Sequence, residues 1–208
     1  MRIKDRARPK VPPVDPGVYI GICVGVIDLG EQYNDNFKKY SNDVQIVWEL
    51  VGETVEVDGE TKPRQLSRTF SFALNKKSRL RAFLSSWNSR QYTDDEFAEL
   101  EIFDQIGKAC QLNVVLNETG EYANIDTVMP LPKGMPAPTT DTPPIRWDMD
   151  AWDDAVFSSL PEWVQEKIKR STQFQKEHTP TDAVDFSDAD APAPAAAAQP
   201  AQTGVCPI

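Results

Sequence analysis

The chain contains 208 residues, 40% of them hydrophobic, and carries a formal net charge of -10. This length allows one compact domain with appendages or two very small domains, and it excludes a large multidomain enzyme. The modest apolar fraction indicates that part of the chain does not fold. No apolar run of about 18 residues could span a bilayer, and the charged start of the chain lacks the apolar stretch of a secretion signal. A cytoplasmic protein with no membrane contact is therefore predicted.

The cysteine and histidine content argues against several kinds of site. Cys23, Cys110 and Cys206 are widely spaced and form no CxxC pair, so neither a disulfide framework nor a zinc cluster is expected. His178 is the only histidine, which gives poor support to a Ser-His-Asp or Cys-His nucleophile system. The prediction is a protein without catalytic residues, metal ions or cofactors.

Proline placement divides the chain, because proline lacks a backbone N–H and disrupts helices and central strands. Of the 17 prolines, only Pro63 lies between residues 17 and 129. Residues 136–208 hold five basic and twelve acidic side chains, and from Asp182 onward few large apolar residues remain. The predicted parts are a flexible basic arm (1–16), a folded core (17–129), a Pro/Trp-rich extension with a short helix (130–178) and a disordered acidic Ala/Pro-rich tail (179–208).

Alternation of apolar and polar residues predicts the first three strands of the core. The runs 18–26, 44–50 and 68–74 follow the period of two that is typical of strands. The turn signal Asp58-Gly59 joins the second and third runs into a long hairpin. Aromatic residues at alternate positions of these strands are predicted to lie in the core, namely Trp48, Phe70 and Phe72.

Helical signals follow the third strand. Asn75 can cap a helix whose apolar face is formed by Leu80, Phe83, Leu84 and Trp87. A capping box from Thr93 to Glu96 starts a second helix. The segments 110–116 and 122–129 then predict a closing hairpin of two strands.

Three strands, a helical insert and a closing hairpin are the element order of the OB-fold, a five-stranded and partly open barrel. We therefore predict a mainly β protein, with an OB-fold barrel and a helical insert between strands three and four. A short helix and the disordered tail follow the barrel. Another small β-barrel or a β-sandwich is the alternative, because element order alone does not fix topology.

The loop after the first strand combines aromatic and basic residues. It contains Tyr33, Phe37 and Tyr40 together with Lys38 and Lys39, in a segment too polar to be core. Single-stranded nucleic acid exposes base faces and a row of phosphates, so a binder needs aromatic platforms and cations. The alternative is that Phe37 and Tyr40 pack the loop onto the barrel while the lysines are merely solvated.

A second basic group surrounds the start of the predicted helix and consists of Lys76, Lys77, Arg79 and Arg81. Cations at this position oppose the helix dipole, so helix stability does not explain them, whereas a bound phosphate would. Arg68 leads into the same region and can serve phosphate or pair with nearby acids. Tyr122, beside a glycine turn, can stack on a base or cover a strand edge.

The extension contains a short apolar helix face. Ser159 and Glu162 form a capping box, and the apolar face consists of Leu160, Trp163, Val164 and Ile168. So short a helix is marginal alone, so it either docks back on the barrel or binds a partner protein. The candidate partner-binding residues are Trp152, Trp163, Phe186 and Ile208.

Several stretches of the chain together resemble a known family. They include NDVQIVWEL (42–50), RTFSFALNKKSRLRAFLSSW (68–87), GKACQLNVV (107–115) and LPEWVQEKIK (160–169). Over residues 17–170 the chain resembles bacteriophage-encoded single-stranded-DNA-binding proteins of the OB-fold type. The resemblance implies a non-enzymatic protein that coats single-stranded DNA in the host bacterial cytoplasm during phage replication and recombination.

The resemblance also has a departure and leaves alternatives open. Bacterial single-strand binders end in several acids and a hydrophobic tip, whereas the last acid here is Asp190, ahead of a Gly204–Ile208 end. Contact with phage or host replication and recombination proteins can therefore run through residues 185–188 instead. The second hypothesis is a phage adaptor or host-takeover protein that binds another protein, and the third is a magnesium-dependent nuclease. A homo-oligomer is compatible with each.

Overall fold

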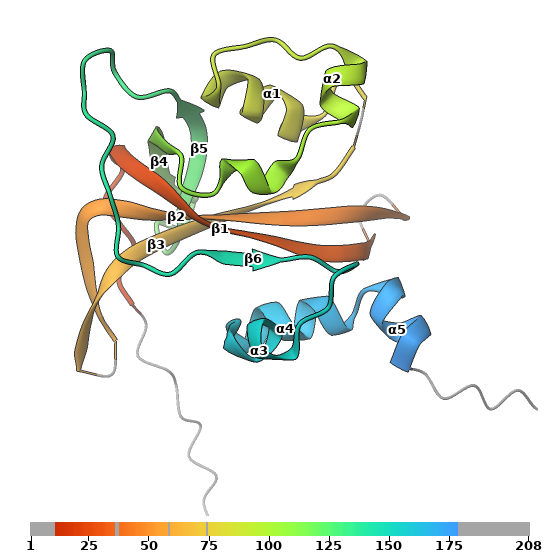
Figure 1. Cartoon of the computed structure of the whole chain (residues 1–208). Helices are drawn as coiled ribbons and strands as arrows, with labels where there is room; N and C mark the ends of the chain where they lie inside the picture. The colour runs from red at the N-terminus through yellow and green to blue at the C-terminus, as the bar shows by residue number, and fades with distance from the viewer. Residues whose placement is uncertain (1–10, 36–37, 58, 74, 179–208) are drawn as a thin grey trace, which may run out of the picture. The chain divides into compact units, whose positions relative to one another are not determined.

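The computed structural model describes residues 11–35, 38–57, 59–73 and 75–178 (Figure 1). Its strands are β1 (Gly17–Asn34), β2 (Lys39–Val57), β3 (Glu60–Ser71), β4 (Ala109–Leu116), β5 (Ala123–Met129) and β6 (Ile145–Trp147). Its helices are α1 (Arg79–Trp87), α2 (Asp94–Ala98), the 3-10 helix η1 (Ile102–Gln105), α3 (Asp154–Ser159), α4 (Glu162–Lys169) and α5 (Thr172–His178). The prediction of a mainly β protein is confirmed. The predicted tail over 179–208 and residues 1–10 of the predicted arm lie outside the described residues.

The long strands form one sheet in the order β3-β2-β1-β4-β5. Neighbouring strands in this order are antiparallel, while β6 pairs in parallel with residues 25–27 of β1. Across the described chain no backbone ladder joins the outer strands β3 and β5, so the sheet is open and the predicted barrel closure is not found. A side chain links the two edges instead. Arg68 Nη1 donates to the carbonyl oxygens of Ile125 and Asp126 on β5, at 2.6 Å each.

β1 and β2 are buried on both faces of the sheet. Successive strand residues point to opposite faces, so Ile46 and Trp48 enter one apolar cluster while Val47 enters the other. In β1, Val26 and Ile27 divide in the same way. A strand buried on both faces needs a cover on each side, and the helices supply it (Figure 1).

The first cover consists of α1, α2 and η1, which continue directly from β3. Leu80, Leu84 and Trp87 of α1 are buried in the first cluster, as predicted, together with Phe70 of β3. The predicted core position of Phe72 is wrong, because this residue follows the end of β3 and is 37% exposed.

The cap of α1 differs from the prediction, whereas that of α2 does not. Ser78 rather than Asn75 is the N-cap of α1, and its side chain accepts a hydrogen bond from Arg81 N. Asn75 Oδ1 instead accepts from Lys77 N at 2.9 Å in the preceding turn. The predicted capping box at Thr93 and Glu96 is confirmed in full.

The second cover comes from the extension. Leu160, Val164 and Ile168 are buried in the second cluster around Trp147 of β6, so the predicted helix docks back onto the sheet. Burial of a side chain of this size contributes about 1.5–3 kcal/mol. The predicted capping box is wrong, because α4 follows Pro161 without a side-chain cap, while the Ser159 hydroxyl donates to the Val156 carbonyl oxygen of α3. Within the part of the chain that the structure describes, no helix combines the length and apolar character that a membrane crossing requires.

A buried carboxylate holds the segment that leads from β5 to β6. Glu49 is 9% exposed and accepts hydrogen bonds from the hydroxyls of Thr140, at 2.7 Å, and Thr142. Burying a carboxylate is costly unless it is hydrogen bonded, so these two donors compensate for its loss of water. The proline-rich segment is thereby fastened across the second face of the sheet.

Beyond the core, β2 and β3 continue as a two-stranded arm. It comprises residues 51–57 and 59–64, and most of its side chains are exposed. Pro63 lies on the edge strand opposite Thr54, where the missing N–H of proline is tolerated. The described side chains of the arm belong to neither apolar cluster.

Gly30 marks the place where α5 and the end of α4 close on β1. Its φ is +69°, and its N–H donates to Asp28 Oδ1 at 2.8 Å, beside an irregularity in the β1–β2 register. A Cβ here would lie 2.8 Å from the Cβ of the buried Ser171 and 2.7 Å from Met149 Cε. The site therefore requires glycine both for its backbone angle and for space.

This double requirement predicts the effect of two glycine substitutions. Gly30→Ala should lower the free energy of unfolding by about 2–4 kcal/mol, because left-handed strain adds to overpacking. Gly52→Ala is the matched control, with φ +82° and no atom within 4 Å, and should cost only about 1–2 kcal/mol. Urea unfolding of both variants measures the difference. Equal losses would contradict the close packing of Ser171 against Gly30.

Candidate nucleic-acid interface

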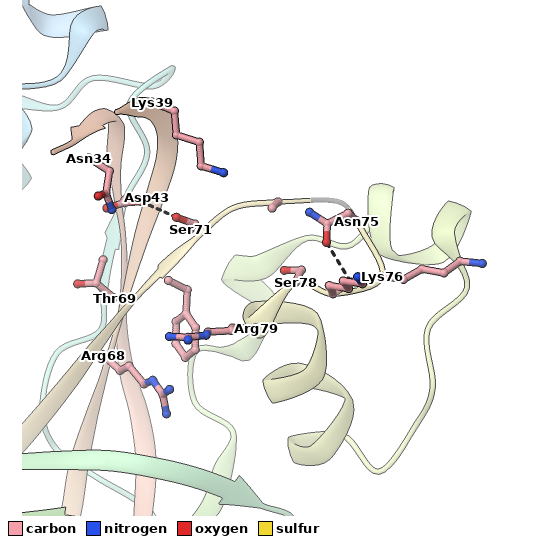
Figure 2. Close-up of a pocket in the computed structure, with 13 residues that line it drawn as sticks. Asn34, Lys39, Asp43, Arg68, Thr69, Ser71, Asn75, Lys76, Ser78 and Arg79 are labelled. Atoms are coloured by element: carbon pink, nitrogen blue, oxygen red, sulfur yellow. Dashed lines mark hydrogen bonds between the residues drawn. The ribbon is translucent and has the colours of Figure 1, made fainter. Parts of the chain in front are cut away.

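An open, polar cleft of about 1040 Å³ lies between the end of the β1–β2 hairpin, β3 and the start of α1 (Figure 2). Its lining residues are Asn34, Lys39, Asp43, Arg68, Thr69, Phe70, Ser71, Ala73, Asn75, Lys76, Lys77, Ser78 and Arg79. Five of these residues are cations and one is an acid. The cleft therefore concentrates positive charge in a chain whose formal net charge is -10.

Arg68 is a cation of the cleft whose side chain is held in place by several contacts. Its guanidinium carbon lies 5.1 Å from the ring centre of Phe70 and 5.5 Å from that of Phe83, in addition to its bonds to β5. Burial lowers the pKa of the Arg68 guanidinium, Asp126 opposes this shift, and the charge of Arg79 adds to it. Arginine remains protonated at neutral pH in proteins, so the positive charge stays in place.

Arg79 supplies a second cation that faces the first. It is the first residue of α1, and Figure 2 shows its side chain extending from the helix toward β3. The repulsion that it exerts on Arg68 is unfavourable, and the helix N-terminus disfavours cations as well. Over the described ranges no carboxylate forms an ion pair with Arg79 or Lys77. A bound anion would offset both the repulsion between the two arginines and the unfavourable position of Arg79 at the helix N-terminus.

The one acid of the cleft is already engaged. Asp43 Oδ1 accepts hydrogen bonds from the hydroxyls of Ser41 and Ser71, at 3.2 Å each. Lys167 of α4 brings its Nζ to 3.6 Å from Asp43 Oδ2. Lys39 extends into the cleft from the β1–β2 hairpin (Figure 2).

The hairpin separates residues that the sequence analysis grouped together. Tyr33 pairs with Tyr40, and Asn34 pairs with Lys39, so strand alternation directs the tyrosines and the cleft residues to opposite faces. The two tyrosine rings lie 5.0 Å apart at 56° and are about half exposed. Lys38 has a φ of 50° in the turn and its Nζ lies 3.9 Å from Asp35 Oδ1. Phe37, the third predicted aromatic, lies outside the described residues.

Two of the four predicted cations near α1 are held by Asp94. Arg81 Nη1 lies 2.5 Å from Asp94 Oδ1, its Nη2 donates to the Tyr92 carbonyl oxygen, and its guanidinium lies over Phe97. The Arg81 side chain is only 11% exposed, so it packs beside α2 and offers little charge to a ligand. The Lys76 side chain points away from the cleft (Figure 2), and its Nζ lies 3.7 Å from Asp94 Oδ2.

The remaining predicted residues lie elsewhere. Tyr122 is 60% exposed at the β4–β5 turn, beside the start of β1, whereas Tyr33 lies at the end of that strand. Trp152 packs against Trp147, Phe157 and Phe174, with ring centres 4.8–5.6 Å apart. Trp163 is 51% exposed on α4. Phe186 and Ile208 lie outside the described residues.

The structure adds residues that the sequence analysis did not select. Thr69 and Ser71 line the cleft from β3, while Asn75 and Ser78 shape the turn that presents Lys77 and Arg79. An Asn three residues before a Ser, directly ahead of a helix, signals this turn followed by a cap. Thr69 and Ser71 carry no such local signal, because only the tertiary position of α1 makes them part of a cleft.

Metal-ligating groups and thiols are arranged as follows in the described residues. These residues contain no group of three or more His, Cys, Asp or Glu side chains that could hold a metal ion. Cys23 and Cys110 are buried, and burial raises the pKa of the Cys23 thiol to about 12. A thiol with so high a pKa is not a ready nucleophile.

Comparison with models of protein families, with curated proteins and with solved structures finds no match for this chain.

Truncation of the two arginines of α1 should affect stability to different extents. Arg81→Ala should lower the free energy of unfolding by about 1–3 kcal/mol, because it removes charged hydrogen bonds from a largely buried side chain. Arg79→Ala, its matched control two residues away, should leave stability within about 0.5 kcal/mol, since it has no described ion-pair partner. Chemical denaturation measures both, and a greater loss for Arg79→Ala would contradict the assignment.

Proposed function

We propose that the protein is a non-enzymatic single-stranded-DNA-binding protein. Lys39, Arg68, Lys77 and Arg79 bind phosphates in the cleft, and the tyrosine pair of the hairpin stacks on bases. The observation that carries the proposal is that Arg68 and Arg79 line the same open cleft, whose one acid is already bonded to two serines and to Lys167. Phosphate neutralisation supplies most of the sequence-independent affinity for DNA.

The tyrosine pair favours single strands over a duplex. Tyr33 and Tyr40 expose about half of their side chains in a 56° tilted pair, which leaves ring surface free for contact. Bases of a duplex are stacked on one another and cannot pack against such rings, whereas each stacked base of a single strand contributes about 1–3 kcal/mol. The binding mode is therefore tolerant of sequence.

We further propose that the sheet is an OB-fold barrel in which the Arg68 side chain, rather than a backbone ladder, joins β3 to β5. The strand order β3-β2-β1-β4-β5 places β3 and β5 where a barrel would close, and Arg68 hydrogen bonds across that position. The helical insert between β3 and β4 also agrees with this fold. A role in phage replication and recombination in the bacterial cytoplasm rests on the sequence resemblance alone.

Charge reversal in the cleft tests the proposal. Wild-type protein should bind a fluorescently labelled single strand more tightly than the matching duplex. Four phosphate contacts predict a slope of about -3 for log affinity against log salt. Lys77→Glu and Arg79→Glu should each weaken binding on the order of tenfold and reduce the magnitude of this slope by about 0.7–1.

Lys62→Glu is the matched control, because it makes the same charge change on the exposed arm of β2 and β3, where Lys62 pairs with Glu60. It should leave the salt slope unchanged. Absence of binding by the wild-type protein at low salt would refute the proposed function and favour the adaptor hypothesis. An equal effect of all three substitutions would refute the cleft as the binding site.

The acidic tail should compete with DNA. Residues 179–208 contain four aspartates and no Lys or Arg, and a tethered anion can occupy a cationic cleft. Removing residues 179–208 should strengthen single-strand binding at low salt, and the gain should vanish at high salt. Replacing the four aspartates with Asn keeps the length and should reproduce the gain. Unchanged or weaker binding by both variants would contradict competition.

A further inference from the structure

A second cavity lies on α4 and the β1–β2 hairpin. It has a volume of about 510 Å³ and is lined by Gln32, Tyr33, Trp163, Glu166, Lys167 and Arg170, together with Asp35. Tyr33, and Tyr40 packed against it, bring aromatic surface to this side of the hairpin. Trp163 adds a third exposed aromatic ring from a segment that is more than 100 residues away in sequence.

The exposure of Trp163 is not explained by the packing of α4. Three buried residues spaced four apart hold α4 on the sheet, namely Leu160 just before the helix and Val164 and Ile168 within it. Trp163 lies beside this buried face and leaves 51% of its surface accessible. Trp152, in contrast, is enclosed by three aromatic neighbours. A large exposed apolar side chain that lines the same cavity as Tyr33 marks a binding surface.

The charges around this cavity compensate one another. Lys167 Nζ lies 3.6 Å from Asp43 Oδ2, and Arg170 Nη2 lies 3.9 Å from Glu166 Oε2. Asp35 lies 3.9 Å from Lys38 Nζ. The surface therefore differs from the cleft, because it offers aromatic faces with little net charge. Such a surface suits bases rather than phosphates.

The two cavities meet at one ion pair. Asp43 lines the cationic cleft, and its partner Lys167 lines the aromatic cavity. Tyr33 and Asn34 are also consecutive residues that line the second and the first cavity respectively. A single strand of DNA that leaves the cleft past Asp43 or over the hairpin would therefore reach the aromatic surface directly.

We propose that Tyr33, Tyr40 and Trp163 form a base-stacking subsite, which single-stranded DNA reaches after leaving the cleft. The inference rests on the proposed function and extends it. It assigns the C-terminal extension a direct part in binding, through Trp163. The strand thus contacts both faces of the β1–β2 hairpin, with phosphates held on one face and bases stacked on the other.

The length of the DNA strand distinguishes binding in the cleft alone from binding that also reaches the aromatic subsite. Single strands of about five and about fifteen nucleotides lie near the two ends of the site sizes known for one OB-fold. Trp163→Ala should weaken binding of the longer strand by about 5- to 150-fold, the equivalent of one stacked base, and leave the shorter strand unaffected. The salt slope should not change, because no cation is removed. Trp163→Phe, the conservative control, keeps a ring and should retain most of the affinity.

Intrinsic fluorescence supplies a readout that a purely structural role would not change. Trp48, Trp87 and Trp147 are buried and Trp152 is packed, so Trp163 should give most of the quenching when the longer strand binds. Trp163→Phe should abolish this quenching while binding persists. Thermal unfolding of both variants at the wild-type temperature establishes that the fold is intact.

Several results would contradict the subsite or the proposed function. Wild-type affinity of Trp163→Ala for the longer strand, or quenching retained in Trp163→Phe, overturns the subsite and leaves the cleft proposal standing. Equal weakening for both strand lengths overturns it as well, because Trp163 would then act through the cleft or the fold. If wild-type protein binds neither strand, the proposed function itself fails, and this result is distinct from the other two.

Discussion

The structure depends on the burial of β1 and β2 on both faces. Their alternating residues serve two apolar clusters at once, so neither face of the central strands can be left to solvent. One cover arises locally, because α1, α2 and η1 follow β3 in the chain. The other has to come from beyond β5, where the three short helices that follow β6 cover the opposite face (Figure 1). The core therefore dictates that the C-terminal extension is part of the fold.

That requirement also determines where the proposed DNA-binding surfaces lie. Packing of the second cover brings α4 beside the β1–β2 hairpin, where Lys167 engages the one acid of the cleft. The first cover places Arg79 opposite Arg68, which already bonds to β5. Arg68 thus links two strand edges and contributes charge to the cleft. In this protein the contacts that complete the core also arrange the cations and rings available to a ligand.

Local signals predicted much of the fold, and long-range contacts account for what they missed. Strand alternation, the apolar face of α1 and the Thr93 capping box were confirmed, because each depends on residues within a few positions of one another. The position of Asp94 against Arg81 was not predictable, since it depends on how α2 returns to α1. Likewise, Tyr33 and Lys39 look like one cluster in the sequence, and only the hairpin register assigns them to opposite faces. Burial of Leu160 could be predicted only by knowing that the second face of the sheet needs a cover from the C-terminal extension.

The two-stranded arm has a consequence for how the chain can vary. The described side chains of its residues 51–57 and 59–64 enter neither cluster and line neither the cleft nor the aromatic cavity. Hairpin length affects loop-closure entropy only slowly, so a longer or shorter arm changes the free energy of folding little. Within the described residues, the arm can therefore change in length without disturbing either apolar cluster, the cleft or the aromatic cavity. It is also the natural position at which to insert a fluorophore or an affinity tag.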